Sequence, residues 1–245
     1  MKKCISNTLF VIAFVVLSFA AQAQVLKPVF SFHDLPKTHN MHITSDGSYY
    51  YCINGGIADS GSIHKYSFRG KFIESYPLIL DSRSLMYNET DKNFYVNTYD
   101  RNIYKIKDLK TGTVELIYAE LYEGEQACIA MSPDGTLVYD NMYGDVNVSS
   151  WPDGTPVDVF YELECGTDVL TGSDCVATDG KYLYTWDSAI KTIYVYDLEG
   201  KKVKSVEISD GSYGFSLSCA HGLVFVSDDG NYGEGTWYGY DLWAK

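Results

Sequence analysis

Short runs of alternating apolar and polar residues repeat along the chain, bounded by Gly, Asp or Asn. Five segments share one plan, in which a brief apolar run leads through a polar turn into a strand rich in Tyr, Val and Ile: ITSDGSYYYCIN, MYNETDKNFYVN, MSPDGTLVYD, VATDGKYLYTWD and SCAHGLVFVSDD. Asp-Gly and Asn-rich pairs supply the positive φ angles that tight hairpin turns require. The pattern predicts strands joined by hairpins, without helical periodicity.

The turns in these segments recur at a nearly constant interval. Their anchors lie 45, 43, 45 and 42 residues apart and are Asp46, Asp91, Asp134, Asp179 and His221. Four of the units continue through a third strand and a turn (RGK, KTG, PDG or EGK) into a fourth strand: FIESYPL, VELIYAEL, PVDVFYEL or VKSVEI. Four short strands per unit of this length are typical of β-propeller blades.

The fifth unit ends with GTWYGYDLWAK and lacks a fourth strand. Residues 28–35 (PVFSFHDL) match the fourth strand of the third unit (PVDVFYEL) at five of eight positions, with Asp and Glu counted as equivalent. We therefore predict that this N-terminal strand completes the last blade, antiparallel to residues 237–242. The predicted fold is all-β: a single five-bladed propeller over residues 24–245, with blades at about 40–80, 82–123, 127–164, 175–209 and 215–245 plus 28–36.

The first 23 residues have the layout of a secretory signal peptide. Lys2 and Lys3 precede an apolar run over residues 9–21, and Ala21-Gln22-Ala23 provides small residues for cleavage before Gln24. A membrane anchor is the alternative, but a spanning helix needs about 20 apolar residues. We expect a secreted or periplasmic protein that is not inserted in the membrane after cleavage.

The charge balance restricts the class of partner. The chain carries 19 Lys and Arg against 32 Asp and Glu, a formal net charge of −13, and shows no basic stripe. Such a chain repels phosphate backbones, so we predict no nucleic-acid partner.

The cysteines suggest one disulfide and no metal site. Cys165 and Cys175 flank a short loop and form the candidate pair, whereas Cys52, Cys128 and Cys219 lie in apolar runs and are expected to be buried free thiols. No pair has C-x-x-C spacing and no His cluster lies nearby, so we expect neither a metal nor another cofactor.

The fourth unit, VATDGKYLYTWDSAIKTIYVYDLEGKKVKSVEI, resembles a repeat of bacterial NHL- and YVTN-type propellers, and MSPDGTLVYD is similar to their S-P-D-G turn. The Arg often found at the start of the third strand in NHL repeats is absent here. The resemblance implies a propeller but no particular activity, because such repeats occur in binding proteins and in enzymes.

Candidate binding residues lie in the loops between second and third strands, which combine aromatic with acidic side chains: Tyr99, Asp100, Tyr143, Trp186, Asp187, Asp228 and Tyr232. Equivalent loops must emerge at one end of the ring, with the Trp186 ring exposed at the channel mouth. Aromatic faces and carboxylates there suit a glycan, a peptide or a partner protein. The alternative is that the carboxylates cap turns and the tyrosines pack between blades.

An enzyme is the second hypothesis. A small carbohydrate-active hydrolase or lyase would need paired carboxylates in the central channel, about 5–10 Å apart. No G-x-S-x-G, P-loop or H-E-x-x-H motif is present, and no catalytic residue is assigned. The sequence therefore favours a binding module.

Overall fold

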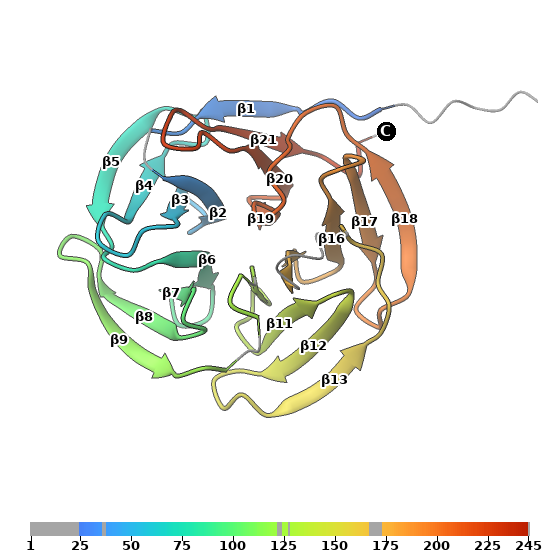
Figure 1. Cartoon of the computed structure of the whole chain (residues 1–245), viewed down its shortest axis with the longest axis horizontal. Helices are drawn as coiled ribbons and strands as arrows, with labels where there is room; N and C mark the ends of the chain where they lie inside the picture. Colours follow the sequence, from blue (N-terminus) through green and yellow to red (C-terminus); the bar gives the residue numbers. More distant parts are fainter. Residues whose placement is uncertain (1–24, 36–37, 122–123, 127, 167–172, 245) are drawn as a thin grey trace, which may run out of the picture.

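The computed structural model describes residues 25–35, 38–121, 124–126, 128–166 and 173–244. Within these residues, 21 strands form five antiparallel sheets around a central axis (Figure 1). In each sheet the first strand lies innermost and the fourth lies at the outer wall. The predicted five-bladed propeller is confirmed. The predicted signal peptide, residues 1–23, lies outside the described residues.

The strands of each blade pair in chain order, and only the last blade draws on a distant segment. The first blade contains β2 (His39–Ser45), β3 (Tyr50–Gly55), β4 (Ser62–Tyr66) and β5 (Phe72–Pro77). The second contains β6 (Ser82–Asn88), β7 (Asn93–Thr98), β8 (Ile103–Asp108) and β9 (Thr113–Tyr118). The third contains β10 (Ala130–Met131), β11 (Leu137–Met142), β12 (Asp145–Ser150) and β13 (Pro156–Phe160), with β14 (Ser173–Asp174) beside β11. The fourth contains β15 (Val176–Thr178), β16 (Leu183–Asp187), β17 (Thr192–Tyr196) and β18 (Lys202–Glu207). The fifth contains β19 (Ser218–Ala220), β20 (Leu223–Asp228), β21 (Thr236–Tyr240) and β1 (Phe30–His33).

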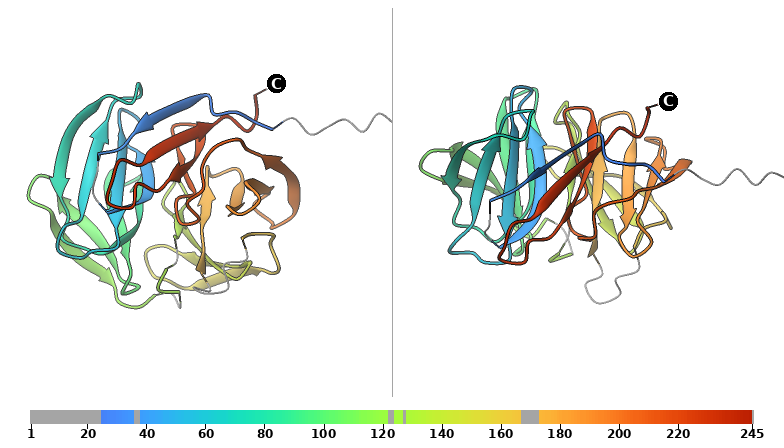
Figure 2. Two further views of the ribbon diagram at one scale, coloured as in Figure 1. Left: turned by 45° about the horizontal axis from the view of Figure 1, so that its top comes forward. Right: turned by 90° about the horizontal axis from the view of Figure 1, so that it is seen from above.

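The fifth blade takes its outer strand from the start of the chain. β1 pairs antiparallel with β21, with Phe30 opposite Gly239, and Figure 2 shows the two strands side by side. Upstream, Leu26 forms a parallel bridge with Ile208, just after the last strand of the fourth blade. We call residues 25–35 the N-terminal clasp. The prediction that an N-terminal strand completes the last blade is confirmed.

A buried carboxylate at the end of the clasp joins the fifth blade to the first. Asp34 Oδ1 accepts hydrogen bonds from Tyr66 Oη at 2.6 Å and His64 Nδ1 at 2.7 Å, and Oδ2 accepts one from Trp237 Nε1 at 3.0 Å. Tyr66 and His64 lie in β4, whereas Trp237 lies in β21. The side chains of Asp34 and His64 have no exposed surface. Removing one partner would therefore leave polar groups buried without compensation.

Turn glycines show that β1 occupies the position of an ordinary fourth strand. Gly70, in the turn between β4 and β5, has a φ of 72°, and a Cβ atom there would lie 2.5 Å from the Phe32 side chain in the clasp. The equivalent turns of the next three blades pack in the same way on the preceding blade: Gly112 on Pro77, Gly154 on Leu121 and Tyr118, and Gly200 on Phe160. The clasp thus packs against the turn of the first blade in the same way as the outer strands of the first three blades pack against the turn of the blade that follows.

Neighbouring blades bury both faces of the middle strands. In β3, Tyr50, Tyr51, Cys52 and Ile53 are each at most 3% exposed. Side chains on alternate faces of this strand enter different clusters, which face different neighbours. Strand tyrosines therefore pack between blades, as the sequence suggested. Among the described residues, no helix is long and apolar enough to cross a bilayer.

In the described part of the chain, Cys52 and Cys128 are buried thiols outside any disulfide, as predicted, while Cys219 is a thiol that is only partly buried. The Cys165–Cys175 bridge stays a prediction, and residues 167–172 between the two lie outside the described residues. If it forms in an oxidising compartment, thiol titration of the denatured mature protein should find three of its five cysteines reactive. Five reactive thiols would exclude the bridge, and one would reveal a second pair.

Candidate functional site

Strand direction divides the loops between two ends of the ring. Because neighbouring strands in a blade are antiparallel, turns after the first and third strands lie at one end, and loops after the second and fourth strands lie at the other. We call these the turn end and the loop end. All seven residues proposed from the sequence lie at or just beyond the end of a second strand, so they share the loop end.

Three of the proposed aromatic residues differ in their surroundings. Tyr143 and Tyr232 are 66% and 58% exposed, respectively. Tyr99 is half-buried, and its Oη donates a hydrogen bond to Glu125 Oε2 at 2.9 Å, while the neighbouring Asp100 is exposed. Glu125 follows the fourth strand of its blade, so an interblade loop meets a second-to-third-strand loop at this end.

The expected exposure of Trp186 is wrong. Its side chain is 3% exposed and belongs to the main apolar core. The indole Nε1 donates to the Tyr213 carbonyl oxygen at 3.4 Å. Trp186 therefore packs in the seam toward the fifth blade instead of facing the channel mouth.

The proposed carboxylates are engaged in local structure. Asp187 Oδ1 accepts a hydrogen bond from the Ala189 backbone N–H at 2.9 Å, which caps the turn after β16. Asp228 accepts bonds from Ser212 Oγ at 2.7 Å and Tyr238 Oη at 2.9 Å. The turn-chemistry alternative accounts for the contacts of both residues.

A hydrogen bond spans the channel at the loop end. Cys128 Sγ donates to the Phe215 carbonyl oxygen at 2.9 Å. Cys128 leads into the third blade and Phe215 into the fifth. Since these blades are not neighbours in the ring, their hydrogen bond crosses its centre.

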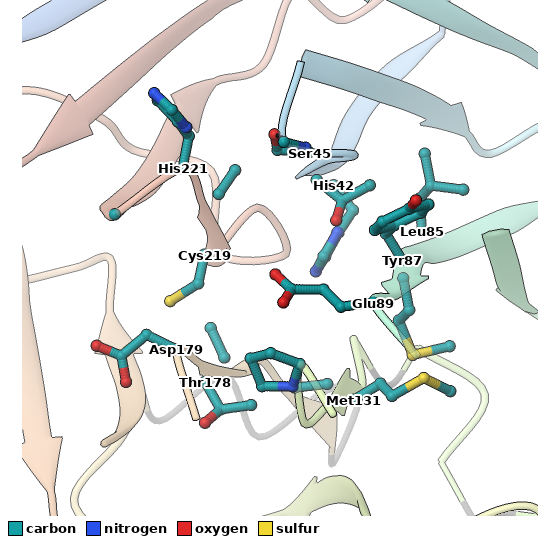
Figure 3. A pocket seen from close by; sticks show the side chains of 18 of the residues that line it. His42, Ser45, Leu85, Tyr87, Glu89, Met131, Thr178, Asp179, Cys219 and His221 are labelled. Atoms are coloured by element: carbon teal, nitrogen blue, oxygen red, sulfur yellow. Dashed lines mark hydrogen bonds between the residues drawn. The ribbon is translucent and has the colours of Figure 1, made fainter. Parts of the chain in front are cut away.

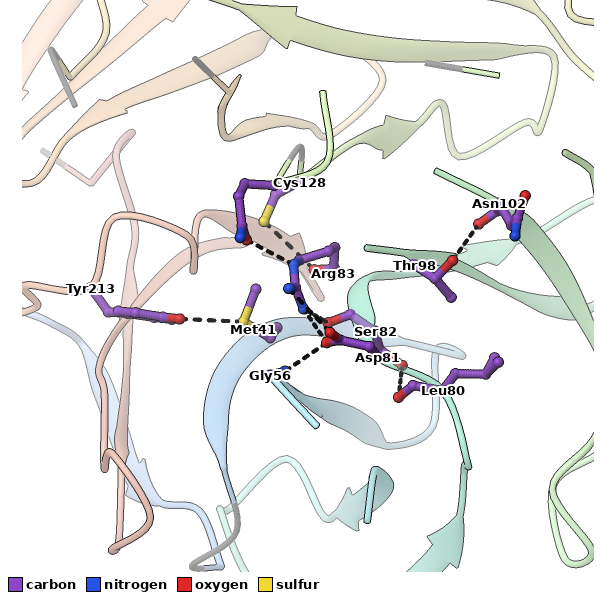
Figure 4. Close-up of polar contacts among 11 residues, drawn as sticks. Met41, Gly56, Leu80, Asp81, Ser82, Arg83, Thr98, Asn102, Cys128 and Tyr213 are labelled. Atoms are coloured by element: carbon purple, nitrogen blue, oxygen red, sulfur yellow. Dashed lines mark hydrogen bonds and ion pairs between the residues drawn. The ribbon is translucent and has the colours of Figure 1, made fainter. Parts of the chain in front are cut away.

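Arg83 packs beside this crossing (Figure 4). Its guanidinium donates to Gln126 Oε1 at 2.9 Å, pairs with the Asp81 carboxylate, and lies over the Tyr99 ring at 5.0 Å from the centroid. Arg83 is 4% exposed. Its charge is therefore already compensated within the protein.

A cavity of about 460 Å³ lies at the turn end (Figure 3). Its walls come from the innermost strand of every blade, represented by His42, Met86, Met131, Ala177 and Cys219. The lining includes the turns after the first strands, so this cavity, which we call the pit, lies on the side of the ring opposite to the one that the sequence favoured. Pockets of roughly 300–1,000 Å³ are the usual size for small-molecule sites.

His42 is a buried polar side chain on the wall of this pit. It is 5% exposed, and burial lowers the pKa of its imidazole to about 4, against a smaller raising effect of a hydrogen bond to the Leu85 backbone. Among the described residues, its Nδ1 has no hydrogen-bond partner. When the neutral imidazole carries its proton on Nε2, Nδ1 is a hydrogen-bond acceptor. His39, three residues earlier, instead pairs with Asp229 at 2.6 Å on the loop end.

Glu89 and Asp179 bring two carboxylates to the wall of the pit, in different states. Asp179 accepts hydrogen bonds from the backbone N–H groups of Lys181 and Tyr182 and from Tyr184 Oη, at 2.8–2.9 Å. Among the described residues, the Glu89 carboxylate has no hydrogen-bond or ion-pair partner, and Figure 3 shows it reaching toward the middle of the pit. Glu89 is thus available to a ligand, whereas Asp179 anchors a turn.

The turn aspartates form a repeated structural device. Three of the four accept bonds from the backbone of their own turn and from a tyrosine hydroxyl four or five residues later, at 2.5–2.8 Å: Asp46 with Tyr51, Asp91 with Tyr95, and Asp179 with Tyr184. Asp134 instead accepts bonds from Ser132 Oγ and from Thr136 in its own turn. The periodic Asp signal in the sequence therefore reports hairpin stability and not a ring of ligand-binding carboxylates.

Two nucleophile candidates are excluded by their surroundings. Cys219 lines the pit, but burial, reinforced by Asp179, raises the pKa of its thiol well above the ordinary value, so the reactive thiolate is scarce. Ser62 Oγ lies 2.9 Å from His64 Nε2, and His64 Nδ1 contacts Asp34, which resembles a hydrolase triad. His64 and Asp34 are fully enclosed and Ser62 is 5% exposed, so this chain of hydrogen bonds holds the seam.

The low pKa of His42 predicts an acid-sensitive stability. The folded-state pKa of about 4 lies below the ordinary value of 6.5, so the unfolded chain takes up the proton first. The contribution of His42 to the free energy of unfolding is therefore fully present above pH 6.5. It falls by on the order of 3 kcal/mol as the pH drops to about 4. Urea unfolding of the parent and of His42→Gln at neutral pH and near pH 4 measures the difference. The other ionisable groups around the pit, Glu89, Asp179, Lys181, Cys219 and His221, are common to both proteins. Equal pH dependence of the two would contradict the assignment.

The sequence did not lead to this pit, because candidate binding residues were sought in the loops and not in the first strand of each blade. Alternate residues of an innermost strand face the channel, as do His42 and Thr44 in β2 and Leu85 and Tyr87 in β6. This alternation could have indicated the pit. His42 is a polar residue at a channel-facing position where most blades have an apolar one. Among the described residues, no three His, Cys, Asp or Glu side chains are grouped to hold a metal ion.

Comparison with known proteins adds no relative. No family model matches the chain, and a search of curated proteins finds no significant match. The propeller architecture is shown by the structure, while kinship with the NHL- and YVTN-type repeats remains a prediction.

Proposed function

We propose that the chain is a noncatalytic binding protein of the cell exterior or periplasm, which holds a small ligand or the end of a larger one in the pit at the turn end. The observation that carries the proposal is the pit itself: a hollow lined by all five blades, with the buried and unpartnered Nδ1 of His42 on its wall. A rigid ring that converges on one concave site suits binding without large movements. Export rests on the signal-like residues 1–23.

A hydrolase or lyase has less support in the same pit. Glycoside cleavage needs a pair of carboxylates with separate roles. Asp179 already accepts three hydrogen bonds from its own turn and from Tyr184, which leaves Glu89 as the available carboxylate. The arrangement therefore favours binding over bond cleavage.

The proposal is tested by mapping where small probes bind. The mature protein, labelled for NMR, is titrated with a panel of alkyl amines, alcohols, carboxylic acids, dipeptides and disaccharides. We expect amide shifts to cluster on β2, β6 and β15 at the turn end. Lys181→Trp, at the exposed rim of the pit, should weaken binding by about tenfold or more through steric blockage, while the paired change Tyr143→Ala and Tyr232→Ala at the loop end should leave it unchanged.

The opposite pattern would overturn the location. If the paired tyrosine change removes binding and Lys181→Trp does not, the ligand binds the loop end, with the exposed aromatics as its platform. Chemical change of a bound disaccharide in the same samples would overturn the noncatalytic assignment.

A further inference from the structure

His42 brings a buried polar atom to the wall of the pit. Its Nδ1 has no hydrogen-bond partner among the described residues. When the neutral imidazole carries its proton on Nε2, Nδ1 can only accept a hydrogen bond. An unpaired buried acceptor costs about 1–3 kcal/mol, so a ligand that brings an N–H or O–H group to it would be favoured.

The charge around the pit points the same way. Glu89 and Asp179 contribute two negative charges, and Lys181 contributes one positive charge at the rim. The Lys181 ammonium lies over the Tyr182 ring, 5.1 Å from its centroid, and so already has a partner. Glu89 is the carboxylate without one among the described residues. The local balance therefore favours a cation, in a chain whose formal net charge is −13.

Much of the remaining wall is apolar. Leu85, Met86, Ala130, Met131, Ala177 and Ala220 line the pit. Methionine side chains adapt to irregular apolar shapes. A ligand that fits must combine an apolar stem with its charged group, because a compact inorganic cation would leave these surfaces wet.

We propose that the pit binds a primary amine carried on an apolar stem, with the ammonium at Glu89 and an N–H or O–H donor of the ligand at His42 Nδ1. This inference rests on the proposed binding function and specifies its ligand class. The amine can come from a free alkylamine or from a lysine side chain, and the two sources share the same chemistry.

Four probes of equal stem length separate the contributions: n-pentylamine, n-pentyltrimethylammonium, 1-pentanol and pentanoate. We expect n-pentylamine to bind at least about tenfold more tightly than 1-pentanol, because only the amine carries a charge that Glu89 can pair. n-Pentylamine should also bind more tightly than n-pentyltrimethylammonium, which has the charge but no N–H donor. Pentanoate should bind weakest. A short blocked peptide with a central lysine, titrated in parallel, tells whether the lysine source is also accepted.

Variants identify the residues. Glu89 is exposed, so Glu89→Gln should fold normally. It should weaken the binding of n-pentylamine by about tenfold or more and leave the binding of 1-pentanol unchanged. The matched control is Glu125→Gln, which alters a carboxylate at the loop end and should leave every probe unchanged. His42→Phe removes the acceptor and should reduce the advantage of n-pentylamine over n-pentyltrimethylammonium. If this variant does not fold, the Glu89 comparison still decides the proposal.

The outcomes separate an error in the ligand class from an error in the proposed binding function. If 1-pentanol or pentanoate shifts the pit residues with equal or greater affinity than the amine, the ligand class is wrong and the binding pit stands. If the amine binds equally to the parent and to Glu89→Gln, the proposed partner of the ammonium is wrong. If no compound of the wider panel shifts the pit residues, the proposed function fails together with this inference.

Discussion

Removal of residues 24–36 is expected to lower the melting temperature by more than about 10 °C or to abolish cooperative unfolding. The deletion removes β1, and with it the hydrogen bonds to β21 and the burial of Phe32 against Tyr50 and Tyr66. It also removes Asp34, which leaves His64 and Trp237 without their partner. Losses of this kind sum to at least about 5 kcal/mol, a large part of the stability of an ordinary domain. Thermal melting followed by circular dichroism measures the effect.

A shorter truncation that starts at Pro28 is the control, because it keeps β1 and Asp34 and loses only the Leu26 bridge. The single change Asp34→Ala should alone cost about 3–5 kcal/mol, since it removes one partner of a buried charged network. Asp158→Ala, on the exposed outer strand β13, should cost less than about 0.5 kcal/mol. A deletion protein that melts within about 2 °C of the parent would show that the clasp does not hold the ring.

Trp186→Ala is expected to destabilise the fold by about 3–5 kcal/mol, because it empties a large volume in the seam between the fourth and fifth blades. The Tyr213 carbonyl oxygen would also lose the indole donor. Equilibrium unfolding in urea measures the change in the free energy of unfolding. We expect the slope of the transition to stay unchanged, since the same surface is exposed on unfolding.

Tyr143→Ala is the matched control for this change. Tyr143 also follows a second strand but is 66% exposed, so its removal should change the free energy of unfolding by less than about 0.5 kcal/mol. If Trp186→Ala melts like the parent and instead weakens ligand binding, the indole would belong to a binding surface at the loop end.

The sequence alone determined the architecture because blade formation depends on local, repeated chemistry. Turn aspartates at intervals of 43 to 45 residues mark hairpins whose backbone N–H groups bond to the aspartate side chain, as at Asp46 and Asp179. The missing fourth strand of the last unit and its likeness to residues 28–35 were enough to predict the clasp, since a closed ring requires every blade to be complete. The common end of the proposed loop residues also followed from strand direction alone.

The tertiary structure decided which end is hollow and which side chains are free. Trp186 and Tyr143 both follow the plan of a second strand and its loop, yet one is enclosed and the other is exposed. The alternation of a strand does not separate them, because neighbouring blades cover both of its faces. The hydrogen bond from Cys128 to Phe215 spans the loop end through residues that are 87 positions apart, and Asp34 meets Trp237 across 203 positions. Contacts of this range leave no periodic trace in the sequence, so only the closed ring brings His42 and Glu89 together in one pit.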